Sequence, residues 1–153
     1  MTKTAVFPGS FDPFTIGHED VVIRSLPLFD KIIIAFGYNS SKSGFFDLEK
    51  RMNWVRQLFA EEPRIIIDSY QGLTIDFCKL VNANFILRGL RTAADFEYER
   101  AIGQINKTMQ PEVETFFLLT SPQYTAVSSS IVREIFRYGG DVSKFIPANM
   151  SLE

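Results

Sequence analysis

The only histidine of the chain, His18, ends a segment of small and turn-forming residues that could bind a phosphate. The apolar run of residues 3–7 predicts a buried strand, and the prolines and glycine within residues 8–13 predict an irregular turn after it. A helix is expected from about Gly17 through Arg24. The order of strand, small-residue turn and helix start therefore predicts an anion site at this point of the chain.

Two interpretations of this segment remain open from the residues alone. In the functional one, backbone N–H groups and the helix dipole attract a phosphate, and His18 donates a hydrogen bond to it from a fixed position. In the structural one, His18 is an ordinary first-turn residue and the glycines only shape the turn, because short motif matches are common.

Composition limits the class of protein. The 153 residues, of which 46% are hydrophobic, suit a single domain over 1–153 with a real core, and most of the 15 Phe are expected to pack inside it. A net charge of −2 gives no basic field for nucleic acid. The single Cys78 excludes an internal disulfide, is expected to be buried, and suits a reducing cytoplasm. No stretch suggests a signal peptide or a membrane span.

Strand-like and helix-like segments alternate along the chain. Further strands are expected at 31–36, 64–68, 84–88 and 115–119, with a turn at Gly89; helices are expected from the N-cap Asp47 to Phe59 and at 73–81, 94–109 and 128–137. Strands that are apolar throughout indicate a sheet covered on both faces. The sequence therefore predicts an α/β fold, a single-domain, doubly wound, Rossmann-like five-stranded parallel sheet with helices on both faces.

Polar and charged residues follow the ends of the predicted strands, where doubly wound folds bind their ligands. Ser10 and His18 follow the first strand, Lys42 the second, and Arg88 and Arg91 the fourth. A second set follows the fifth strand and consists of Tyr124, Ser128, Ser129 and Ser130. Their shared edge predicts one ligand site there.

Each of these features also has a structural interpretation. Lys42 could be a solvated loop lysine, and the two arginines could pair with Asp95 or Glu97 at the surface. The serines could cap the last helix. Because all of these residues follow strand ends at the same predicted edge of the sheet, the ligand-site interpretation is favoured over the structural ones.

The chain resembles a known family. Thr15-Ile16-Gly17-His18 is similar to the Thr/His-x-Gly-His signature of the nucleotidyltransferase superfamily. Over about residues 3–147 the chain resembles bacterial phosphopantetheine adenylyltransferases, through Pro8-Gly9-Ser10-Phe11-Asp12-Pro13, Ser41-Lys42, Arg88-Gly89-Leu90-Arg91, Asp95-Phe96-Glu97-Tyr98-Glu99 and Ser128-Ser129-Ser130-Ile131-Val132-Arg133. This resemblance implies transfer of the adenylyl group of ATP to 4′-phosphopantetheine, giving dephospho-coenzyme A and pyrophosphate in the penultimate step of coenzyme A synthesis.

The resemblance also implies roles for individual residues. Ser10 and His18 would contact the α-phosphate, Lys42 and Arg88 the acceptor phosphate, and Thr74 the pantetheine arm through its backbone. The catalytic set would be His18, Ser10, Lys42 and Arg91, and the nucleotide would be bound by Ser10, Phe11, His18, Gly89, Leu90, Arg91, Glu99, Tyr124, Thr125, Ala126, Val127, Ser128, Ser129 and Ser130. Ser10 stands where many relatives have threonine, and Tyr124 where they often have tryptophan.

Metal, assembly and regulation follow from the resemblance as further expectations. Mg²⁺ would arrive with ATP, because the sequence offers no protein metal cage and a single histidine excludes a histidine-rich zinc site. A homohexamer and feedback inhibition by coenzyme A are implied as well.

Two other functions remain as alternatives. A nucleotidyltransferase acting on nicotinamide mononucleotide or glycerol phosphate would share the histidine and serine motifs but should lack the block from Arg88 to Glu99. A non-catalytic nucleotide-binding module would have little need of Lys42 and Arg88 as an acceptor site.

Overall fold

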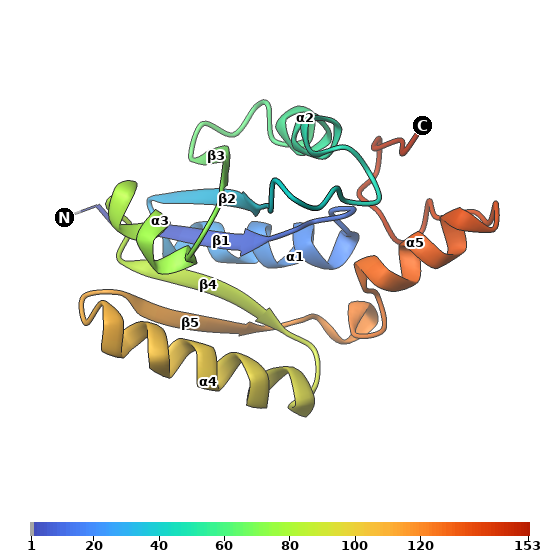
Figure 1. The fold of residues 1–153 in the computed structure, drawn as a ribbon. Coiled ribbons are helices and arrows are strands. Elements are labelled where there is room, and N and C mark those ends of the chain that lie inside the picture. Colours follow the sequence, from blue (N-terminus) through green and yellow to red (C-terminus); the bar gives the residue numbers. More distant parts are fainter. Residues whose placement is uncertain (1) are drawn as a thin grey trace.

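In the computed structural model, which describes residues 2–153, five parallel strands form one sheet in the order β3-β2-β1-β4-β5 (Figure 1). The predicted single domain begins at Met1, which lies outside the described residues. The strands are β1 (Thr4–Gly9), β2 (Lys31–Gly37), β3 (Ile65–Tyr70), β4 (Phe85–Leu90) and β5 (Glu114–Leu119). The predicted doubly wound parallel sheet is confirmed, and its strand order reverses between β1 and β4.

The helices cover both faces of this sheet. They are α1 (Ile16–Ser25), α2 (Leu48–Leu58), α3 (Thr74–Leu80), α4 (Ala93–Met109) and α5 (Ser129–Arg137), with short 3₁₀ helices η1 (Leu26–Leu28) and η2 (Pro122–Tyr124). Asp47 precedes α2 as predicted, but its side chain makes no capping hydrogen bond.

Alternate residues of the central strands supply two separate cores, as the two-residue period of a strand requires. Ala5 and Ile34 face α1 and α2, whereas Val6 and Ile33 face α3, where Cys78 is fully buried as expected. A third cluster joins α5 and the C-terminal residues to α2 and contains Phe46, Trp54, Val132, Val142, Ile146 and Leu152.

Two strands that lead to the predicted site, β1 and β4, extend beyond their predicted ends. β1 continues through Pro8 to Gly9 because it stays paired with β2 as far as Phe36. Gly89 is not a turn residue but lies inside β4, opposite Leu118 of β5. Pairing with an outer neighbour extends each of these central strands past its expected end.

The two central strands nevertheless part from each other early. β1 pairs with β4 only at Ala5–Phe85 and Val6–Ile86, although both strands continue beyond these residues. The sheet therefore opens between β1 and β4 at its carboxyl end, at the strand-order reversal where such folds bind ligands.

Candidate active site

A cavity of about 300 Å³ lies where β1 and β4 separate. Its walls come from the end of β1 and the following turn, the first turn of α1, the middle of β4 and the start of α5. Most of the predicted nucleotide-binding segments thus meet here; those that line the cavity are Ser10, Phe11, His18, Gly89, Arg91, Val127, Ser128, Ser129 and Ser130.

His18 is held by the cap of α1. The Thr15 backbone N–H donates to His18 Nδ1 at 2.9 Å, and the His18 backbone N–H donates to Thr15 Oγ1 at 3.3 Å. Burial lowers the pKa of His18 to about 3, and the positive charges of Arg88 and Arg91 add to this effect. The imidazole is therefore neutral at physiological pH. Because Nδ1 accepts, the hydrogen-bond network assigns the proton to Nε2, which is free to act as a donor.

Aromatic rings surround this imidazole and explain its desolvation. The Phe11 ring lies edge-on to it with centroids 4.9 Å apart, and the Phe14 centroid lies 5.3 Å away. Phe11 is only 3% exposed, so its ring supports His18 rather than presenting a face to a base. The prediction that Phe11 binds the nucleotide stays a prediction.

Arg88 is the most tightly held cation of the site. Its Nε and Nη2 donate to the two carboxylate oxygens of Glu99 at 2.6 and 3.0 Å, and its Nη1 donates to the Pro8 carbonyl at 2.5 Å. These bonds use three of the five guanidinium N–H groups, which leaves two for a ligand.

One of the two arginines has the acidic partner that the structural interpretation expected, and the other does not. Arg88 pairs with Glu99 instead of Asp95 or Glu97, while Arg91 lies 3.6 Å from Asp95. Glu97 pairs with Arg100. The carboxylate of Glu99 thus accepts hydrogen bonds from Arg88. The predicted contact of Glu99 with ATP stays a prediction.

The three serines of α5 face the same cavity with different partners. Ser128 is the N-cap and its Oγ accepts from the Ile131 N–H at 3.2 Å, so the capping interpretation is right for this serine. Ser129 Oγ donates to the Pro13 carbonyl at 2.8 Å. The first amides of a helix have no partner within it, so the start of α5 offers N–H donors to an anion.

A second cavity of about 310 Å³ shares the site's central residues. Pro8, Gly9, Ser10 and Arg88 line both cavities. The second extends past Thr74, whose hydroxyl lies 2.6 Å from the Tyr70 hydroxyl, toward α4. Two ligands bound side by side would therefore meet at Ser10 and Arg88.

On the α4 wall of this second cavity, sequence reasoning named only Glu99 and missed three further residues. Tyr98, Ile102 and Asn106 all line it. Their spacing of four residues places them on one helix face, and this was the available signal. Nothing in the sequence distinguishes that face from one buried against the sheet.

Several predicted residues lie away from the two cavities. Lys42 belongs to the exposed loop 38–45, in which it forms a bridge with Asn39, and it lines neither cavity. Leu90 is buried in β4. Tyr124 ends η2, Thr125 and Ala126 follow it, and none of the three lines either cavity. Their predicted roles remain predictions.

No three His, Cys, Asp or Glu side chains among residues 2–153 are grouped so that they could hold a metal ion. No helix in that range has the length and apolar character needed to cross a membrane.

The chain is similar to known proteins over nearly its whole length. The cytidylyltransferase-like family model matches residues 6–135. A phosphopantetheine adenylyltransferase of Flavobacterium psychrophilum is 52% identical over 145 residues, covering 95% of each chain. One from Bacteroides fragilis is 49% identical over 150 residues, covering 98% of this chain and 99% of the relative.

Solved structures support the fold. A putative nicotinate-nucleotide adenylyltransferase from Vibrio parahaemolyticus superposes with a TM-score of 0.67 at 18% identity, covering 95% of this chain and 94% of that one. At this identity the likeness concerns the fold alone.

Proposed function

The chain belongs to the phosphopantetheine adenylyltransferase family, and from this premise we infer that it transfers the adenylyl group of ATP to 4′-phosphopantetheine. The products are dephospho-coenzyme A and pyrophosphate. The observation that carries the assignment to this site is the pair of adjoining cavities that share Ser10 and Arg88. A transferase needs two ligand sites that meet at the reacting atoms, whereas a nucleotide-binding module needs one.

The reaction places simple demands on the protein. An oxygen of the acceptor phosphate attacks the α-phosphorus of ATP, a new P–O bond forms, and the bond to pyrophosphate breaks in line with it. A phosphate monoester dianion is already nucleophilic, so the protein aligns two anions and stabilises the charge of the transition state. Arginines, a neutral N–H donor and a helix N-terminus supply this stabilisation.

We assign the residues as follows. The Nε2–H of His18 and the Ser10 hydroxyl donate to the α-phosphate oxygens. Arg88 binds the acceptor phosphate with the two N–H groups that Glu99 and Pro8 leave free. Lys42 reaches the same phosphate from its loop. The Tyr70–Thr74 side of the second cavity takes the pantetheine arm.

The leaving group has its own contacts in this proposal. Arg91 and the start of α5 stabilise the β- and γ-phosphates, and the Tyr124–Ala126 segment takes the adenine side of ATP. Arg91 and Asp95 are 3.6 Å apart and about one-third exposed, so Arg91 can exchange this carboxylate for a phosphate.

We further propose that Mg²⁺ would enter bound to ATP and would neutralise part of the phosphate charge, since residues 2–153 contain no group of three His, Cys, Asp or Glu that could hold the ion by themselves. Feedback by coenzyme A is proposed at the same two cavities, because coenzyme A contains both an adenosine and a pantetheine part. We also propose that the protein is located in the cytoplasm.

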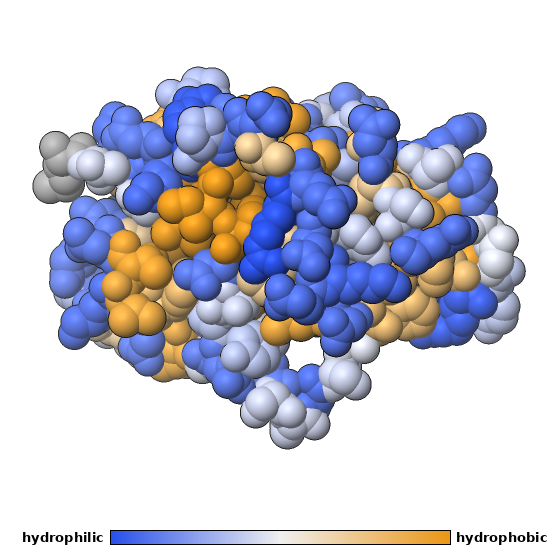
Figure 2. All heavy atoms as spheres, turned by 90° about the horizontal axis from the view of Figure 1, so that it is seen from above, coloured by the Kyte–Doolittle hydropathy of each residue, from blue (hydrophilic) through white to orange (hydrophobic). Residues whose placement is uncertain are grey.

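We propose a homohexamer from the family resemblance, and exposed apolar side chains support contacts between copies of the chain. Ile105 on α4 and Leu119 at the end of β5 are 60% and 72% exposed. Figure 2 shows another hydrophobic area on the face where β3 and α2 lie. Apolar surfaces of this kind favour contacts between copies.

The function is tested by pyrophosphate release with ATP and a panel of acceptors. Release is expected with 4′-phosphopantetheine, and no release with pantetheine, which lacks the attacking oxygen. Nicotinamide mononucleotide and glycerol phosphate are the competing acceptors. Faster turnover with either of them would replace the assignment.

A further inference from the structure

A buried ion pair that lines neither cavity lies directly behind the site. Asp12 is 8% exposed and Arg51 of α2 is 4% exposed, and Asp12 Oδ1 lies 3.7 Å from Arg51 Nε. Two buried charges are costly to keep out of water unless hydrogen bonds satisfy them. Their partners therefore indicate what the pair does.

Asp12 holds the end of the loop that carries Lys42. Its Oδ2 accepts from the Phe45 N–H at 2.7 Å and its Oδ1 from the Phe46 N–H at 2.9 Å. Both oxygens of one buried carboxylate thus bind consecutive backbone amides. Such charge-assisted bonds are stronger than neutral ones.

Arg51 holds the same loop and the Ser10 turn together. Its Nε donates to the Phe46 carbonyl at 2.9 Å, and its Nη1 donates to the Ser10 carbonyl at 2.5 Å. The guanidinium is a planar donor, so these bonds orient the two backbone segments relative to each other.

Gly44 is an independent sign that the loop rests on the ion pair. A Cβ added at Gly44 would lie 2.8 Å from Asp12 Oδ2 and 2.9 Å from Arg51 Nη2. Any side chain there would push one of the two charged groups away. The loop can bind the pair this closely only because residue 44 is glycine.

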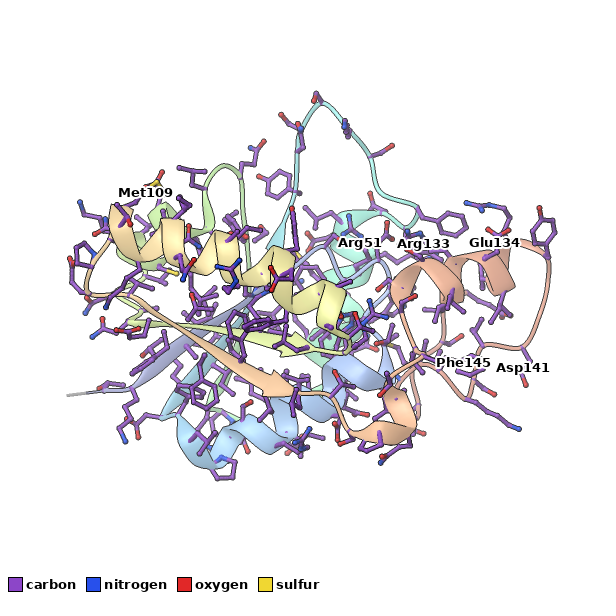
Figure 3. The ribbon with its side chains drawn as sticks, turned by 90° about the horizontal axis from the view of Figure 1, so that it is seen from below. Arg51, Met109, Arg133, Glu134, Asp141 and Phe145 are labelled. Carbon is purple, nitrogen blue, oxygen red and sulfur yellow. The ribbon has the colours of Figure 1, made fainter. Side chains whose placement is uncertain are left out.

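The loop also has contacts outside the ion pair, because the Phe45 ring lies 6.2 Å from the Phe136 ring of α5 and the Arg137 guanidinium lies 5.2 Å from the Phe45 ring. All of residues 38–45 are exposed, and Figure 3 shows the loop as the cyan ribbon that projects from the body of the molecule. Near its other end, the Ser40 N–H donates to the Gln71 side chain at 3.2 Å. The buried pair thus supplies the hydrogen bonds that restrain the backbone at residues 45 and 46, beside the ring contacts of Phe45 with α5.

The turn after β1, which contains Ser10 and Asp12, is also hydrogen-bonded to α5. Arg133 Nη1 donates to the Asp12 carbonyl at 2.8 Å, and Figure 3 shows Arg51 from α2 and Arg133 from α5 approaching this region. This bond uses the Asp12 backbone rather than its carboxylate. A change of the Asp12 side chain therefore leaves the tie to α5, on the triphosphate side, in place.

We propose that Asp12 and Arg51 are positioning residues that hold the Lys42 loop and the Ser10 turn in one arrangement for the acceptor phosphate. The proposal rests on the proposed function, which places Ser10 and Lys42 at that phosphate. With the pair intact, the C-terminal half of the loop is already ordered before the acceptor binds. Without the pair, the loop loses conformational entropy only when the acceptor binds, and this loss lowers the affinity for the acceptor.

Three substitutions test the arrangement from different sides. Asp12→Asn removes the charge and one acceptor oxygen, Gly44→Ala displaces the pair without changing any charge, and Arg51→Lys keeps the charge but loses the planar donor. Arg56→Gln is the matched control, because Arg56 also lies on α2 but pairs with Glu49 at the surface. Steady-state kinetics with each substrate and amide hydrogen exchange over residues 38–46 are measured for all four.

The expected result is selective for the acceptor. Asp12→Asn and Gly44→Ala should each raise the KM for 4′-phosphopantetheine by about 10- to 100-fold, the range for a lost hydrogen bond to a charged group, and should lower kcat. The KM for ATP should change by no more than about 2-fold. The amides of Phe45 and Phe46 should exchange faster, Arg51→Lys should be intermediate, and Arg56→Gln should match the wild type.

Equal increases in both KM values, or a lower melting temperature with unchanged KM values, would overturn the positioning role. If Asp12→Asn does not fold, Gly44→Ala carries the test. Hydrogen exchange separates this proposal from the function on which it rests. Should the wild type release no pyrophosphate with 4′-phosphopantetheine, the function fails, while unchanged exchange at Phe45 and Phe46 in the variants would refute the anchoring itself.

Discussion

The state of His18 can be measured without ambiguity, because the chain contains one histidine. The perturbation is acidification from pH 8 to pH 5. Burial and the nearby arginines lower the pKa of His18 to about 3, so only about 1% of the imidazole should be protonated at pH 5. A histidine with the ordinary pKa of about 6.5 would be about 97% protonated there. The difference is large enough to decide the question in one titration.

The assay is NMR of protein labelled with ¹³C,¹⁵N-histidine and prepared without a histidine tag. The single Cε1–H resonance should not move between pH 8 and pH 5, and the ¹⁵N shifts should identify Nδ1 as the bare nitrogen and Nε2 as the protonated one. A midpoint above pH 5.5, or a proton on Nδ1, would refute the assignment of His18 as a neutral Nε2–H donor.

The same shift predicts how acid affects stability. As the pH falls below about 6.5, the unfolded chain binds a proton at His18 before the folded chain does, so the folded state loses stability until the pH nears 3. The contribution of one group is at most about 1.4 kcal/mol per pH unit. Urea unfolding of wild type and His18→Gln at pH 7 and pH 5 measures it, since glutamine cannot titrate. An equal loss of stability in both proteins would count against the lowered pKa.

Further predictions concern the substrates. His18→Ala should lower the single-turnover rate by about 100- to 1,000-fold while ATP affinity is retained, and a loss confined to ATP affinity would contradict the transition-state role. Lys42→Ala and Arg88→Ala should weaken 4′-phosphopantetheine more than ATP in calorimetric titrations; equal weakening would move both residues to the nucleotide side. Glu99→Gln should weaken binding of 4′-phosphopantetheine in the same way as Arg88→Ala but by less, because it weakens the bidentate pair that holds the Arg88 guanidinium. A selective loss of affinity for ATP would instead make Glu99 a nucleotide ligand. Arg91→Ala should reduce affinity for ATP and pyrophosphate by about 10-fold and leave AMP nearly unchanged, so the ratio of ATP to AMP affinity is the quantity to measure.

Local patterns in the sequence were sufficient to predict most helices and strands and the position of His18 at the centre of the site. The β-branched runs of residues 31–36 and 64–68 form the expected strands, because β-branched side chains fit the pleated surface of a sheet even where, as in β3, they are only partly buried. His18 lies in a capping box that involves only Thr15, three residues earlier, so neighbouring residues place it.

The partners of the charged residues were decided by the tertiary structure. Arg88 pairs with Glu99, 11 residues away on α4, and Asp12 binds amides 33 and 34 residues away. Several acids lie near each arginine in sequence, and local spacing cannot choose among them. The choice depends on where α4 packs against the sheet.

The shape of the site was also beyond the sequence. Gly89 reads as a turn residue, yet pairing with β5 keeps it in a strand, while β1 and β4 part after Val6 and Ile86. The sequence by itself determined which residue types were available for phosphate chemistry and which elements carry them. Only the tertiary structure decided which of them share a cavity, because strand ends and ion pairs depend on neighbours that are distant in the chain, and those neighbours compete for the same hydrogen-bonding groups.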